Sequence, residues 1–241
     1  MAKKRLNKKV AIIGSILVMF AILVAIGGIL YISRDPEKYL KDGEIAIAQK
    51  DYEKGTHDLL KARSLAKDDD FKVMVLFKLA DAYMEMGRWN NVMGCWNEIV
   101  RIESDNVQAR LNRLNYLYIM ANAGSNTLWK ELNSQTSEIL EKIEGKDLAN
   151  ENVSKWIIPQ LEDKDMFYGN LESYLYLLRG RAVLENVIRG AITDPDASLL
   201  RAIDDLEKVR QGQPENVNTY WYLAKAINYR GQLLASRGSA R

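Results

Sequence analysis

Side chains that could act as nucleophiles, bases or metal ligands are few in this sequence of 241 residues. It contains a single histidine, His57, and a single cysteine, Cys95. A zinc site made only of nitrogen and sulfur ligands needs about four of them, so one chain of this composition cannot form it. A cysteine nucleophile would need His57 as its base. We expect instead that Cys95 is buried beside Trp96, as unpaired cysteines usually are, and that His57 is exposed on a helix.

Two acidic runs, Asp68–Asp70 and Glu162–Asp165, are the remaining candidates for a metal site. Adjacent carboxylates on a linker do not converge on one ion, and the spacing of a calcium-binding loop is missing. The sequence also lacks the glycine-rich phosphate loop, the dinucleotide fingerprint and the serine elbow of known enzyme classes. We therefore expect solvated linkers at both runs, and a protein without catalysis, cofactor or bound metal.

The N-terminal segment predicts a membrane anchor. Val10–Ile32 is a stretch of 23 residues without a charged side chain. As a helix it reaches about 35 Å, enough to cross a hydrocarbon core of about 30 Å. A cleaved signal peptide is the alternative, but its apolar region is usually only about 7–15 residues. The basic residues before the span, Lys3, Lys4, Arg5, Lys8 and Lys9, predict a cytoplasmic N-terminus and an outside domain, periplasmic in a bacterium.

The rest of the chain is mildly acidic. Five of the 34 Lys and Arg residues precede residue 33, and none of the 32 Asp and Glu residues does. The part after the span therefore has a small negative net charge, which offers no general attraction to phosphates. This balance argues against a nucleic-acid partner.

Two segments of similar pattern indicate a helical repeat. Ala46–Ala62 and Tyr83–Ile99 each end one amphipathic helix, turn at Lys50-Asp51 or Gly87-Arg88, and place an aromatic residue on the next helix. These aromatics are Tyr52 and Trp89, and their spacing is close to the 34 residues of a tetratricopeptide (TPR) unit.

On these residues the chain resembles the TPR family. The 73–106 unit matches its pattern at Leu76, Leu79, Ala80, Tyr83, Gly87, Trp89, Trp96 and Ile99. The 36–69 unit matches at Tyr39, Gly43, Tyr52, Leu59 and Ala62, and residues 202–231 give a split third match. The resemblance implies an all-α protein, a right-handed α-solenoid of helical hairpins that stack on one another. Small residues (Gly43, Ala80, Ala224) should let helices approach, while Tyr52, Trp89 and Trp96 fill the core.

The expected organisation is a basic tail at 1–9, a transmembrane helix at 10–32, hairpins at 33–144, an irregular insertion at 145–170 and further hairpin helices at 171–241. Within it we expect helices at 105–121, 127–143, 171–192 and 216–231. No full second helix follows the last of these. Either that helix is a short cap, or the sequence is the N-terminal portion of a longer protein.

The family's register also implies a partner-binding face on the first helix of each hairpin. The candidate residues on it are Met74, Phe77, Asp81, Met84, Asn115, Tyr118, Trp221 and Lys225. We expect a membrane-anchored scaffold that binds proteins or peptides and contacts the bilayer through 10–32. One alternative is the anchor and recognition arm of a longer enzyme, catalytic after residue 241. Another is self-association through the uncapped end.

Overall fold

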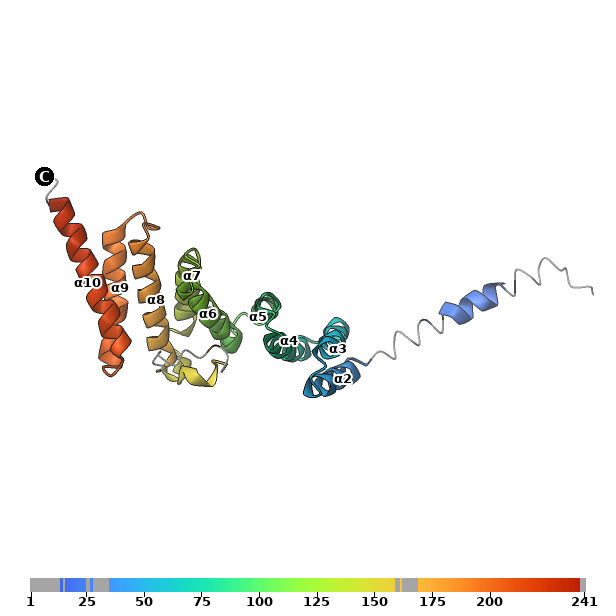
Figure 1. Cartoon of the computed structure of the whole chain (residues 1–241). Helices are drawn as coiled ribbons and strands as arrows, with labels where there is room; N and C mark the ends of the chain where they lie inside the picture. The colour runs from blue at the N-terminus through green and yellow to red at the C-terminus, as the bar shows by residue number, and fades with distance from the viewer. Residues whose placement is uncertain are drawn as a thin grey trace, which may run out of the picture. The chain divides into compact units, whose positions relative to one another are not determined.

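The computed structural model describes residues 14, 16–24, 27, 35–158, 161 and 169–238. Apart from an isolated bridge between Asn152 and Asn170, the secondary structure of these residues is helical. The elements are α2 (Pro36–Ala48), α3 (Tyr52–Leu65), α4 (Asp69–Glu85), α5 (Trp89–Ile102), α6 (Val107–Asn122), α7 (Leu128–Ile143), the short 3₁₀ helices η1 (Asp147–Asn150) and η2 (Val153–Lys155), α8 (Leu171–Ile188), α9 (Pro195–Gly212) and α10 (Val217–Gly238) (Figure 1). The all-α prediction is confirmed for this part of the chain.

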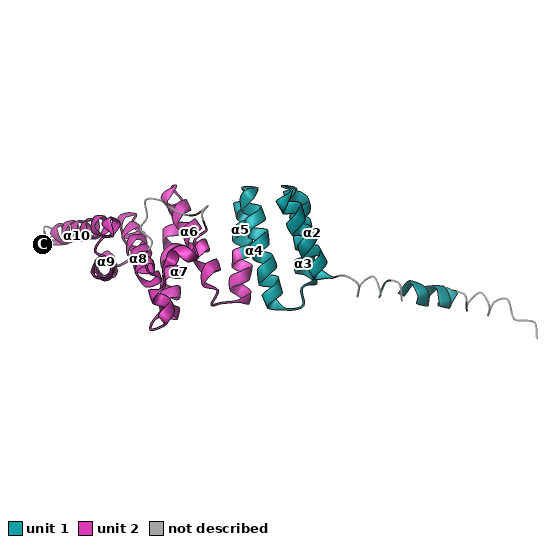
Figure 2. Cartoon of the chain, turned by 90° about the horizontal axis from the view of Figure 1, so that it is seen from below, with its two compact units in different colours: residues 1–95 teal, residues 96–241 magenta. Residues whose placement is uncertain are grey.

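Contacts divide the chain into two compact units, Met1–Cys95 and Trp96–Arg241, with the boundary inside α5 (Figure 2). In the first unit α2 packs on α3 and α3 on α4. In the second, α6 packs on α7, α7 on α8, α8 on α9 and α9 on α10, and Figure 1 shows α8, α9 and α10 side by side. Within each unit these consecutive helices thus pack on one another, as the repeat pattern predicts for helical hairpins.

The expected transmembrane helix falls largely outside the described residues. Of the 10–32 segment, residues 14, 16–24 and 27 are described, and they are helical with exposed side chains. Within the part of the chain that the structure describes, no helix combines the length and the apolar character needed to cross a membrane. The span at 10–32 therefore stays a prediction.

Aspartate caps begin the helices of the first unit. The side chains of Asp35 and Asp51 accept hydrogen bonds from backbone amides in the first turns of α2 and α3. Asp68 does the same for α4, where its carboxylate accepts from the amide of Phe71 at 2.8 Å. Such a cap satisfies an amide that has no partner within the helix. The 68–70 run is therefore the start of a helix, not the linker expected, because Asp69 and Asp70 lie in the first turn of α4.

The turns between these helices lie where the sequence places them. Lys50, between α2 and α3, has φ +63°, and Gly87, between α4 and α5, has φ +67°. Both are in the left-handed region that ends helices. This backbone conformation strains Lys50, which has a side chain, whereas glycine adopts it at residue 87 without strain.

Two glycines allow α2 and α3 to pack closely. A Cβ added at Gly43 would lie 3.1 Å from the carbonyl oxygen of Gly55 and 3.0 Å from Leu59 Cγ. One added at Gly55 would lie 2.5 Å from Ile47 Cγ1. The sequence identified Gly43 and Ala80 as packing positions correctly, since both are buried, and it missed Gly55. Ala224 is exposed, so its assignment as a packing residue was wrong.

The expected aromatic core is confirmed only in part. Trp96 is fully buried, whereas Tyr52 and Trp89 are half-buried. Cys95 is buried and His57 is exposed, as expected. The helices expected at 105–121 and 127–143 match α6 and α7 closely, but α10 extends to Gly238, seven residues beyond the predicted end at 231.

The described residues of the predicted 145–170 insertion are 145–158, 161, 169 and 170, and hydrogen bonds join them to α6. The two short 3₁₀ helices of the insertion are joined to the start of α8 by backbone hydrogen bonds, Val153 to Gly169 at 3.0 Å and Leu171 to Glu151 at 2.8 Å. Two asparagines of α6 hold its backbone. Asn112 Oδ1 accepts from the amide of Ile158 at 3.0 Å, and Asn115 Nδ2 donates to the carbonyl of Leu161 at 3.1 Å.

Candidate protein-binding surfaces

The first unit presents an exposed face formed by α2 and α4. Met74 is 41% exposed, Phe77 is half-buried and Asp81 is exposed, at the spacing that puts all three on one side of α4. Lys78 on the same side pairs with Glu44 of α2, Nζ to Oε1 2.8 Å. We call these residues the α2–α4 face. It combines two apolar side chains with an exposed carboxylate.

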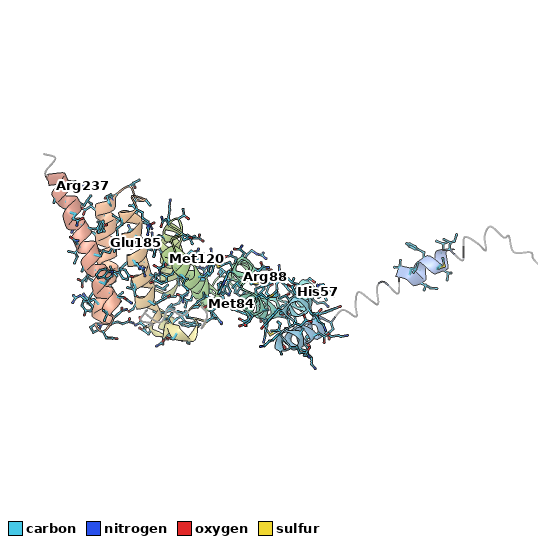
Figure 3. All side chains as sticks on the ribbon, viewed as in Figure 1. His57, Met84, Arg88, Met120, Glu185 and Arg237 are labelled. Atoms are coloured by element: carbon cyan, nitrogen blue, oxygen red, sulfur yellow. The ribbon has the colours of Figure 1, made fainter. Side chains whose placement is uncertain are left out.

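The other predicted residue on α4, Met84, is buried. It lies at the end of α4, close to the turn that leads into α5 (Figure 3). Met84 therefore offers a partner little surface.

Asp81 is the residue of the α2–α4 face whose pKa is shifted. Partial burial raises the pKa of its carboxyl above the usual value, Lys78 opposes this shift, and Glu85 adds to it. Desolvation disfavours the charged form of an acid, and a nearby cation favours it. A cationic group from a partner would act in the same direction as Lys78 and hold Asp81 charged.

The predicted residues of α6 are enclosed by other helices. Asn115 accepts a hydrogen bond from the hydroxyl of Tyr174 on α8 and donates to the insertion, and it is 1% exposed. Tyr118 is buried edge-on against Trp129, with ring centroids 6.3 Å apart. As they lie, Asn115 and Tyr118 have almost no surface for a partner. Partner binding at these two positions stays a prediction.

Arg181 of α8 lies at the centre of an aromatic cluster in the second unit. Its guanidinium carbon is 4.7 Å from the ring centroid of Tyr118, 5.3 Å from that of Trp129 and 4.7 Å from that of Tyr222. It also donates hydrogen bonds to the Tyr118 hydroxyl and to Asn122. Each cation–π contact is worth about 0.5–2 kcal/mol, depending on its desolvation. Burial, followed by the nearby Tyr118 hydroxyl, raises the pKa of Tyr222 far above its usual value. We infer that this cluster joins α6, α7, α8 and α10 and is structural.

Lys225 and Trp221 of α10 differ in their surroundings. Lys225 Nζ is 3.0 Å from Oε1 of Glu185, which is largely buried on α8 and also contacts Arg189 at 3.2 Å (Figure 3). Lys225 is therefore half-buried in an ion pair that joins α8 and α10. Trp221 is 67% exposed and stands clear of that pair.

Sequence reasoning missed most of a surface around Trp221. Val217, Tyr220, Ile227 and Leu234 are also exposed large apolar residues of α10. Their spacing places them on one side of the helix, and this pattern was readable from the sequence. We call these four residues and Trp221 the α10 stripe.

Among the described residues, no group of three or more His, Cys, Asp and Glu side chains is arranged to hold a metal ion. His57 and Cys95 both lie in the first unit, one exposed and the other buried. The α2–α4 face and the α10 stripe present apolar and charged side chains, which suit the binding of another protein surface. These features define a class: an all-α protein of stacked helical hairpins.

Comparisons with known proteins do not narrow this class to a family. No protein-family model matches the sequence, and no curated protein matches it. Among solved structures, the chain is similar to the crystal structure of the TPR domain of P58(IPK), with 16% sequence identity and a TM-score of 0.32. The match covers 86% of this chain and 54% of that one, so the chain spans about half of that structure's length. At this TM-score the likeness carries no argument about partner or activity.

Proposed function

We propose that this chain is a protein-binding scaffold, held at a membrane by its N-terminal segment, that binds partner peptides without catalysis. The observation that supports it most is the α2–α4 face, where Met74 and Phe77 are presented to solvent on a packed helical layer. Methionine and aromatic side chains adapt to apolar partners. Helical hairpins hold such side chains in fixed positions, which lowers the entropic cost of binding.

The charge around this face suggests the chemistry of the partner. Four carboxylates, Glu37, Glu44, Asp81 and Glu85, lie on this side of α2 and α4 against two cations, Lys41 and Lys78, and Lys78 is paired with Glu44. A peptide with apolar anchors and flanking Lys or Arg side chains would complement this arrangement. Such a peptide would gain both apolar burial and charge complementarity.

Site-specific photo-crosslinking in cells tests the scaffold proposal. A photoreactive residue at Met74 should capture a discrete partner, and Asp81→Lys in the same chain should reduce capture by removing the attraction for basic side chains. Leu60 on α3 is the matched control, because it is apolar and 40% exposed, against 41% for Met74. Equal capture from Met74 and Leu60, or capture unchanged by Asp81→Lys, would contradict the proposed face.

The membrane part of the proposal rests on the uncharged 10–32 stretch and on the basic residues before it. Labelling with an impermeant maleimide tests its orientation, using Ala2→Cys and Lys67→Cys in intact cells or spheroplasts. Label is expected at 67 and not at 2 until the membrane is permeabilised, and the burial of Cys95 keeps the background low. A chain that carbonate extracts from membranes would refute the anchor.

A further inference from the structure

Among the described residues of the second unit, most of the exposed large apolar side chains lie on α10. Val217 is 77% exposed and Trp221 67%, and Tyr220, Ile227 and Leu234 continue the same side of the helix. The opposite side of α10 packs on α9 and α8, where Leu223 and Ala226 are buried. The α10 stripe therefore faces away from the unit's core. Contiguous exposed apolar side chains of this kind mark interaction sites.

The stripe complements itself when two copies of α10 lie antiparallel. An arrangement that places Val217 opposite Leu234 of a second copy also places Tyr220 opposite Gly231 and Ala224 opposite Ile227. Large side chains then face small ones, which is how packed helices interdigitate. A Cβ at Gly231 would meet nothing within 4 Å, so the surface there is open to receive a tyrosine ring. In this register the two helices overlap over residues 217–234 of α10, which gives a contact about 27 Å long.

The charges at the two ends of α10 favour the same arrangement. Glu215 is exposed just before the helix, and Arg237 is exposed in its last turn (Figure 3). Antiparallel pairing brings Glu215 of one copy beside Arg237 of the other, at both ends of the contact. It also places the positive end of each helix dipole near the negative end of the other.

The remaining cations of α10 do not oppose this pairing. Lys225 is bonded to Glu185, and Arg230 Nε lies 2.7 Å from Oδ1 of Asp196. Both charges are compensated within their own chain, so two α10 helices can approach without strong repulsion.

We propose that the α10 stripe is a homodimer interface, in which α10 packs antiparallel against α10 of a second copy of this chain. The dimer would carry two copies of the α2–α4 face and so bind partners bivalently. Bivalent binding raises the apparent affinity without new contacts. The dimer itself does not depend on the proposed function, because its interface and the α2–α4 face lie in different units.

Sedimentation velocity of the full chain in detergent micelles tests the dimer. We expect a dimer that becomes a monomer in Ile227→Lys, because a charge would be buried in the contact. Leu200→Lys is the matched control, since Leu200 is an exposed leucine on α9 of the same unit, and it should leave the dimer intact. Circular dichroism checks that both variants keep their helices. A wild-type chain that stays monomeric up to about 100 µM, well above the Kd of most specific complexes, would overturn the proposal.

Charge reversal tests the orientation and the identity of the occupant. Glu215→Arg and Arg237→Glu should each raise the dimer Kd about tenfold, since the two-fold symmetry changes two pairs at once. The double variant should restore wild-type affinity, because its reversed charges meet again across the interface. If Ile227→Lys leaves the dimer unchanged, the dimer contact does not involve the α10 stripe. If the double variant does not restore the wild-type Kd, the two α10 helices do not pack antiparallel. A partner helix from a different protein would bind to monomers and show no such restoration. Each of these results overturns the proposal.

Discussion

The ion pair between Arg179 of α8 and Asp205 of α9 makes an asymmetric prediction. Two hydrogen bonds join them, Nε to Oδ2 and Nη2 to Oδ1, both 2.7 Å. The Asp205 side chain is 1% exposed, whereas that of Arg179 is 18% exposed and lies 5.3 Å from the ring of Tyr176. The hydrogen bonds that Arg179 donates to Asp205 raise the pKa of its guanidinium, against the effect of burial, so this group is charged. Removing Arg179 leaves a fully buried carboxylate without its partner, whereas removing Asp205 leaves a guanidinium that is partly exposed.

Arg179→Met should be the more damaging change. It keeps most of the side-chain volume and leaves a fully buried carboxylate unpaired, which costs roughly 3–5 kcal/mol of unfolding free energy. Asp205→Ala leaves a guanidinium that reaches solvent and the face of Tyr176, so we expect about 1–3 kcal/mol. The double variant Arg179→Met/Asp205→Leu replaces the pair by apolar groups and should cost within about 1 kcal/mol of the wild type.

Urea unfolding followed by circular dichroism measures all three free energies. Arg210→Met is the matched control, because Arg210 pairs with Glu207 on the same α9 helix at an exposed position. It should cost under about 1 kcal/mol, as surface pairs do. If Asp205→Ala costs more than Arg179→Met, or if the double variant is worse than either, the burial argument fails.

Three further changes test local packing, titration and capping. Gly55→Ala should destabilise the chain by roughly 1–3 kcal/mol in urea melts because a methyl group meets Ile47, whereas Gly94→Ala, in α5 with open space around it, should stabilise it by about 0.5–1 kcal/mol. Burial raises the pKa of Asp81 in the folded state, so its contribution to stability is present at low pH and is lost as pH rises through that pKa. Thermal melts should therefore show Asp81→Asn gaining stability over the wild type as the pH rises above about 4, the ordinary pKa of an aspartate. Parallel pH profiles of the two proteins would contradict this.

Asp68→Ala removes the cap of α4 and should lower the free energy of unfolding by about 1 kcal/mol, measured as a lower urea midpoint with unchanged slope.

Helix positions were predictable because their signals are local. Gly87 ends α4 through its own φ, so this signal lies at the position of its effect. The same holds for the boundaries of α6 and α7. The cap at Asp68 is equally local, but the 68–70 run was interpreted as a linker, and there the prediction was wrong. The exposed face of α4 was also predictable, because the register of a helical hairpin is set by its apolar period.

The surroundings of α6 were not predictable, because distant segments provide them. Tyr174 bonds to Asn115 across 59 residues, and Arg181 bonds to Tyr118 across 63. A single sequence contains no signal that links these positions. Asn115 and Tyr118 were expected to face a partner, and here Asn115 contacts the chain's own insertion and α8, while Tyr118 contacts α7 and α8. The α10 stripe was missed for another reason: only Trp221 was considered, although the apolar period continues along the helix.

The order in which the helices pack has a consequence for how the second unit folds. Most of its contacts join helices that are consecutive in sequence, so they can form in chain order as synthesis proceeds, and such local topology favours rapid folding. The contacts of Arg181 are among the exceptions, since they join it to Tyr118 of α6 and Tyr222 of α10. That cluster can close only after α10 has been made. A chain interrupted before α10 would therefore lack the contact of Arg181 with Tyr222 and the ion pair of Glu185 with Lys225.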